Sequence, residues 1–355
     1  MNPASLIPTP DTLTAHWRWF QFLLMLTFPL HLLAMNAMLG SALTSLAAHM
    51  MPGRHHRELS HELAKALPLL VAFTVNLGVA PLLFVNVIYG HLLYSSTVLM
   101  GLYWLAIIPI IITAYYLAYI YDFGFKKLGN IGPFAVIIFM ALAMSVGFVF
   151  SHNMTMMILP ATWTRWFDNP SGTLLNLSDP TLVARYLHII TGSLAVGSLL
   201  AALYSRIALK GDPEVSEAGQ TLGMRLFSWL TLLQLPAGIW FLLTLPQETM
   251  KRFMGGDTIS TALLALGILL AIATLAAGFK RMVIPALWMT IPLVYVMSFM
   301  RDSVRTSYLA PYFDMTKVPA NVQWSPLVLF LVSLVAGLAV IFWMLSKLPA
   351  FKKAD

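Results

Sequence analysis

The sequence predicts an all-α integral membrane protein, a bundle of about nine transmembrane helices with its N-terminus outside and its C-terminus in the cytoplasm. Of the 355 residues, 59% are hydrophobic and only 10% are charged, and the mean hydropathy is +0.79. A soluble domain has roughly a quarter of charged residues, so most of this chain is expected to lie in lipid. The absence of cysteine excludes disulfides, thiolate metal sites and covalent c-type haem attachment.

Nine apolar runs are long enough to cross a bilayer, which takes roughly 20 helical residues. Turn-forming residues separate most of them, at Met51-Pro-Gly, Leu128-Gly-Asn, Asn169-Pro-Ser-Gly, Gly211-Asp-Pro and Met254-Gly-Gly-Asp. We expect a single transmembrane domain over 1–355 and no soluble domain. The predicted spans are 17–48, 66–97, 98–121, 131–151, 182–207, 223–245, 259–278, 282–300 and 325–346.

The distribution of cations predicts the orientation. With the N-terminus outside, thirteen of the 21 Lys and Arg residues lie in inner segments and eight in outer segments, which agrees with the excess of cations in cytoplasmic loops of membrane proteins. The net charge of +7 is therefore explained by topology and predicts no nucleic-acid partner. The basic inner segment 49–65, which holds His49, His55, His56 and His61, is interpreted as a solvated loop.

No Asp, Glu, Lys or Arg lies near the middle of a predicted helix. Ion-coupled transporters usually carry buried charged relays, so this class is disfavoured, and histidine becomes the candidate for polar chemistry in the membrane. Four histidines lie in apolar runs at related depths: His31, His91, His152 and His188. Neutral imidazole is a common axial haem ligand. The alternative is that each histidine is a hydrogen-bonded packing residue.

Four further residues are candidate cofactor-binding residues. Gly192 lies one turn after His188 on the same helical face, where a small side chain leaves room for a macrocycle or for close helix packing. Arg185 could reach a haem propionate or simply extend to the membrane surface. Arg301 and Arg305, expected in an outer loop after the eighth helix, could bind propionates, a quinone or an acidic partner.

Three segments resemble the large subunit of cytochrome bd quinol oxidases. They are Asn76-Leu-Gly-Val-Ala80 with Tyr89-Gly90, the run from Arg185 to Gly192, and Gln21-Phe22 followed by His31. The resemblance implies a haem b scaffold in a bacterial inner membrane, with one or two haems, and a hetero-oligomeric respiratory complex. It also implies electron transfer between quinone and a periplasmic c-type cytochrome, with haem ligands mainly within 17–207 and helices six to nine over 223–346.

The departures from that family bear on the reaction. The long outer quinol loop is replaced by residues 246–258, and Phe299 and Asn86 stand where the resemblance places two glutamates. The resemblance therefore favours an oxidoreductase subunit that transfers electrons over a terminal quinol oxidase. A haem-free membrane anchor or transporter subunit is the third hypothesis.

Overall fold

The computed structural model describes residues 3–347, and the described chain is almost entirely helical. This confirms the predicted all-α class. The short pieces are the 3₁₀ turns η1 (Pro3–Leu6), η2 (Gly129–Ile131), η3 (Pro160–Phe167) and η5 (Met315–Lys317), helix α7 (Gln247–Lys251) and the π turn η4 (Arg252–Gly256). The long helices are α1 (Trp17–Met50), α2 (Arg54–Leu99), α3 (Gly101–Leu128), α4 (Gly132–Ile158), α5 (Thr181–Ala208), α6 (Pro213–Thr244), α8 (Thr258–Phe279), α9 (Val283–Leu309) and α10 (Trp324–Ser346).

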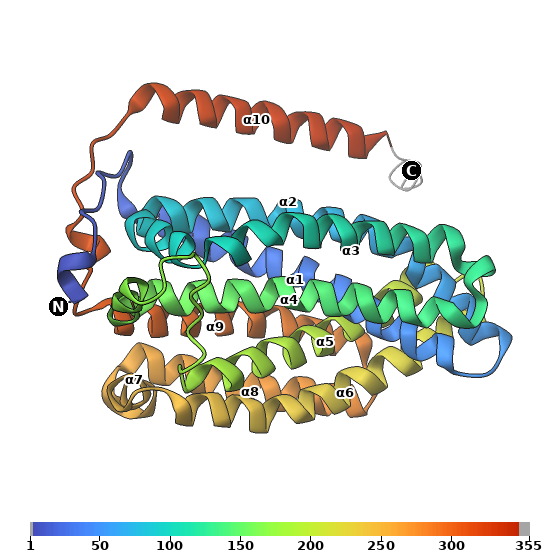
Figure 1. Cartoon of the computed structure of the whole chain (residues 1–355). Helices are drawn as coiled ribbons and strands as arrows, with labels where there is room; N and C mark the ends of the chain where they lie inside the picture. The colour runs from blue at the N-terminus through green and yellow to red at the C-terminus, as the bar shows by residue number, and fades with distance from the viewer. Residues whose placement is uncertain (1–2, 348–355) are drawn as a thin grey trace.

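Eight helical segments of the described chain are long and apolar enough to cross a membrane. One of them, Gly101–Ile158, contains both α3 and α4, which run antiparallel on either side of the turn η2 (Figure 1). The protein is therefore a multi-pass helical bundle in contact with lipid. Two of the cations counted for the orientation, Lys352 and Lys353, lie outside the described residues.

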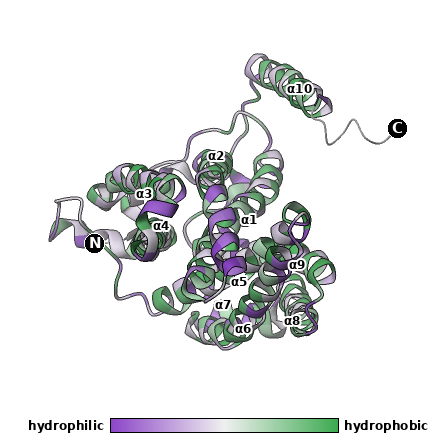
Figure 2. Cartoon of the chain, turned by 90° about the vertical axis from the view of Figure 1, so that its right-hand side faces the viewer, coloured by the Kyte–Doolittle hydropathy of each residue, from purple (hydrophilic) through white to green (hydrophobic). Residues whose placement is uncertain are grey.

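The long helices lie side by side, with α10 apart from the rest (Figures 1 and 2). Helix α1 is central and packs against α2, α4, α5 and α9, while α5 also packs against α6 and α9. The loops 159–180, 245–257 and 310–323 gather at the end where the described chain begins, which we call the N-terminal end. The turns 51–53, 129–131 and 209–212 lie at the opposite end.

Small residues let the central helices approach closely. A Cβ built on Gly197 of α5 would lie 1.7 Å from the backbone oxygen of Asn36 in α1, and one built on Gly40 would lie 2.1 Å from the backbone of Gly197. On the other side of α5, a Cβ on Gly223 of α6 would lie 2.6 Å from the Ser198 oxygen. Membrane helices associate through such backbone contacts because lipid provides no hydrophobic force between them.

The opposite end differs from the prediction of a solvated loop over 49–65. Only residues 51–53 are non-helical. Helix α2 begins at Arg54 because residues 55–65 contain neither Gly nor Pro and an Arg54–Glu58 pair supports its first turns. His49 is buried, with Nδ1 3.2 Å from the Tyr121 hydroxyl and Nε2 2.9 Å from the Gly129 oxygen. His55, His56 and His61 lie on α2. Helix α6 also begins early, at Pro213, with the Asp212 carboxylate as its N-cap.

The prediction of an outer loop at 301–309 is wrong. These residues form the last turns of α9, and Arg305 is only 4% exposed. The segment contains neither Gly nor Pro, and its charged side chains find partners inside the bundle, so nothing ends the helix before Leu309. This end of α9 contributes charge to the core.

Helix α10 lies apart from the bundle and has no buried residue in its described length (Figure 2). The segment before it pairs with the start of the chain. The Leu13 amide donates to the Pro319 oxygen at 3.0 Å, and the Asn321 amide donates to the Leu13 oxygen at 2.8 Å. These bonds connect the beginning of the chain to its last helix at the N-terminal end.

Candidate functional site

Buried charge is concentrated at the N-terminal end, where α9 meets α1 and α2. Arg305 donates to the Asp302 carboxylate through Nη2, and its guanidinium carbon lies 4.6 Å from the centre of the Tyr89 ring. The Gln21 amide of α1 donates to the other Asp302 oxygen at 2.6 Å. Two further Arg305 donors, Nε and Nη1, are buried without a hydrogen-bond partner among the described residues. A buried donor without a partner costs roughly 1–3 kcal/mol.

Two more arginines extend this group. Arg301 lies over the Phe28 ring at 4.6 Å and within electrostatic range of both Arg305 and Arg185. Arg185, on α5, donates to the Ser151 oxygen and the Thr155 hydroxyl of α4, each at 3.3 Å, and lies 3.9 Å from Asp179. We call Arg185, Arg301 and Arg305 the arginine cluster.

The arginine cluster carries uncompensated charge. Its three cations face two carboxylates, those of Asp179 and Asp302, which leaves an excess of one positive charge (3 − 2 = +1). Charge away from water is costly unless it is paired. The arrangement therefore suits an anionic group. A carboxylate is a suitable anion, because a guanidinium group can form a bidentate pair of hydrogen bonds with it.

His152 of α4 lies beside Arg185 and is completely buried, at 0% exposure. The Phe148 ring contacts it edge to face at 4.5 Å. Neither ring nitrogen has a hydrogen-bond partner among the described residues, and the Asn153 amide nitrogen next to it also has none. An imidazole with a free lone pair in an apolar setting is the form that ligates iron.

His91 lies two residues beyond a kink in α2 at Tyr89, whose backbone leaves the helical region at φ −117° and ψ 22°. Its Nε2 is buried without a partner in the described chain, and its ring lies 4.8 Å from that of Phe313. Phe313 also contacts Tyr89, at 5.7 Å, so it links His91 to the arginine cluster. The kink itself lies beside the arginine cluster, since the Arg305 guanidinium lies over the Tyr89 ring.

His31 lies deeper, against α2. Its Nδ1 is 3.0 Å from the backbone oxygen of Thr74, which can only accept, so Nδ1 carries the hydrogen and Nε2 keeps its lone pair. A histidine held in this way by a carbonyl is the usual arrangement for a metal ligand. A Cβ built on Gly78 would lie 2.9 Å from the His31 ring, so the absence of a side chain at Gly78 leaves the space that the imidazole occupies.

His188 has a partner within the protein. The Gln234 amide of α6 donates to its Nε2 at 3.2 Å, and its Nδ1 is buried without a partner. Gly192 faces the same glutamine, because a Cβ added to it would lie 2.8 Å from the Gln234 nitrogen. The small residue is thus used for close helix packing at this position, and ligation of iron by Nε2 requires Gln234 to move.

The structure therefore places three of the candidate histidines and all three arginines near one end, with His31 deeper in the bundle. Gln234 and Asp179 are site residues that the sequence analysis missed. The sequence does carry a signal for Gln234, since it is a polar residue within the apolar run 223–245. Asp179 lies in a loop, and only the tertiary structure brings it to Arg185.

Within residues 3–347, no group of three or more histidine, aspartate and glutamate side chains is arranged to hold a metal ion directly. Axial ligation of a haem needs only one or two protein ligands. The chain matches no protein-family model and no curated protein.

Proposed function

We propose that the chain is a haem b-binding subunit of a respiratory electron-transfer complex in a bacterial inner membrane. In this proposal it crosses the membrane nine times, with the N-terminal end outside, and moves electrons between quinone and a periplasmic c-type cytochrome. The observation that carries the proposal is His152, completely buried with both ring nitrogens unpartnered beside Arg185. Such a side chain is costly unless it serves a ligand.

The residues present fit a haem. His31 and His152 have nitrogens available for iron, His91 has one, and His188 has one once Gln234 moves. The arginine cluster, with its excess positive charge, suits the two propionates. Haem iron supplies one-electron transfer when it is bound. His152 and Arg305 are buried, and the arginines would offset the negative charge that the group brings.

Purified protein is expected to contain non-covalent haem b. A pyridine haemochrome assay in mild detergent should give at least one haem per chain, and the reduced-minus-oxidised spectrum should show the sharp α band of low-spin haem. The chain has no cysteine, so acid acetone should extract all of the haem. A haem content far below one per chain in protein that remains folded would remove the proposal.

The cytochrome partner is expected to bind through exposed cations at the N-terminal end. The buried position of Arg305 makes it unsuitable for docking, which corrects the interpretation of residues 301–309 as an exposed loop. Lys251 is exposed and Arg252 is partly exposed. Reversal of both charges, Lys251→Glu with Arg252→Glu, should slow reduction of an acidic c-type cytochrome about tenfold at low ionic strength and less at high salt.

Stopped-flow measurement of cytochrome reduction at several salt concentrations tests this. The matched control is Arg206→Glu with Lys210→Glu, which reverses two exposed cations at the opposite end. Equal slowing by both pairs would show a general charge effect, and unchanged rates for the first pair would place the partner elsewhere.

A further inference from the structure

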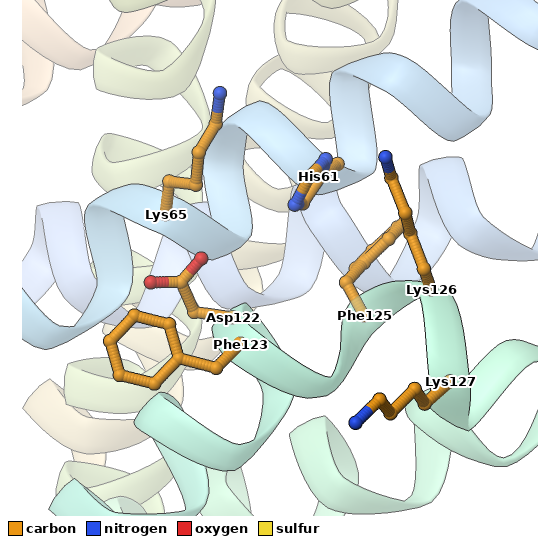
Figure 3. Close-up of a pocket in the computed structure, with 7 residues that line it drawn as sticks. All are labelled: His61, Lys65, Asp122, Phe123, Phe125, Lys126 and Lys127. Atoms are coloured by element: carbon orange, nitrogen blue, oxygen red, sulfur yellow. The ribbon is translucent and has the colours of Figure 1, made fainter.

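An open pocket of about 640 Å³ lies at the opposite end of the bundle, between the beginning of α2 and the end of α3 (Figure 3). It is far along the helices from the arginine cluster and takes no part in the proposed haem site. Its lining residues are His61, Lys65, Asp122, Phe123, Phe125, Lys126 and Lys127.

The pocket is positively charged. Three lysines and the Asp122 carboxylate line it, and Glu62 pairs with one of the lysines, which leaves a net charge of +1 (3 − 2) without His61. Lys65 is paired with Glu62 at 2.5 Å, whereas Lys126 and Lys127 are exposed. The His61 ring stacks on buried Phe125 at 4.5 Å and forms a flat wall beside these cations (Figure 3). The pocket thus offers a site for an anion.

A lipid-facing apolar stripe leads directly to the pocket. Exposed residues recur along one face of α3 at helical spacing, and the last of them, Phe123, is 79% exposed and lines the pocket. The stripe consists of Ile112, Tyr116, Ile120 and Phe123. In a membrane this face contacts acyl chains, so the lysines lie where α3 leaves the hydrocarbon, at headgroup depth.

We propose that this pocket binds the phosphodiester headgroup of an acidic phospholipid, with an acyl chain lying along the α3 stripe. Lys126 and Lys127 supply the charge that a phosphate requires, and His61 and Phe125 form the wall against which the headgroup packs. A soluble phosphate would bind the lysines but would make no contact with the apolar stripe on α3. The combination of both features at one place favours the lipid.

Native mass spectrometry of delipidated protein with added lipid tests the proposal. Phosphatidylglycerol should be retained in preference to phosphatidylcholine, and glycerol phosphate should not displace it. The double variant Lys126→Gln with Lys127→Gln is expected to bind phosphatidylglycerol about thirtyfold more weakly, since each membrane-surface cation contributes roughly a factor of five.

The control is Arg206→Gln with Lys210→Gln, which removes two exposed cations at the same end but outside the pocket. Its affinity should match that of the unmodified protein. Equal retention of the two lipids, equal weakening by both double variants, or displacement by glycerol phosphate would each overturn the proposal. A thermal-shift measurement confirms that each variant is folded before its binding is compared.

Discussion

Replacement of Gly197 by Leu is expected to prevent the bundle from assembling. A single Cβ at this position would lie 1.7 Å from the Asn36 oxygen, and because that oxygen belongs to the backbone of α1, no rotamer change can relieve the clash. Overpacking usually costs about 1–3 kcal/mol, and more where the neighbours are rigid. We expect Gly197→Ala to lower the free energy of unfolding by at least about 3 kcal/mol and Gly197→Leu to yield no monodisperse protein.

Size-exclusion chromatography and thermal unfolding in detergent measure this effect. Gly147→Ala is the matched control, because it lies within α4 and a Cβ there meets nothing within 4 Å. Alanine is a better helix former than glycine by roughly 0.5–1 kcal/mol, so the control should be neutral or slightly stabilised. A Gly197→Ala protein as stable as Gly147→Ala would contradict the close crossing of α1 and α5.

Replacement of His188 by Ala is expected to remove or convert one low-spin haem signal while the protein still inserts in the membrane. The structure offers a competing role, since His188 also accepts a hydrogen bond from Gln234. If packing were its only role, His188→Ala and Gln234→Ala would each cost roughly 1–3 kcal/mol and would leave any haem spectrum unchanged.

The two variants separate these roles when spectrum and stability are measured together. Gln234→Ala should retain the haem signal, since it removes only a hydrogen-bond donor. His61→Ala, at the other end of the bundle, should also retain it. An unchanged haem spectrum in His188→Ala would show that His188 is not an axial ligand and would leave His31, His91 and His152 as the candidates. A Gly192→Leu variant does not separate the two roles, because the larger side chain would crowd Gln234 whether or not a macrocycle is present.

The sequence was sufficient for the helices but not for their polar ends. Long apolar runs locate each span because lipid requires internally bonded helices. The starts of α2 and α6 were missed since their first turns are polar and continue beyond the apolar runs. The loop predicted at 301–309 failed for a related reason, as charged residues suggested water where the bundle supplies partners.

The pairing of site residues could not be obtained from one sequence. Gln21 and Asp302 are 281 residues apart along the chain, and their hydrogen bond depends on how α1 and α9 pack. The histidines, by contrast, could be singled out as candidates from their positions, because a polar side chain in an apolar run is conspicuous. What the sequence left open was which nitrogens have partners, and only the tertiary contacts of His31, His152 and His188 decide that.

The separate position of α10 bears on the order of biogenesis. Within residues 3–347 it is the last long helix in chain order, and none of its residues is buried, so the core of the preceding helices can form without it. A hydrophobic helix is stable in a bilayer by itself, since its backbone bonds are internal. The pairing of Leu13 with residues 319–321 can form only after translation has passed Asn321. This contact between residue 13 and residues 319–321 therefore forms late, after all the helices of the central bundle have been synthesised.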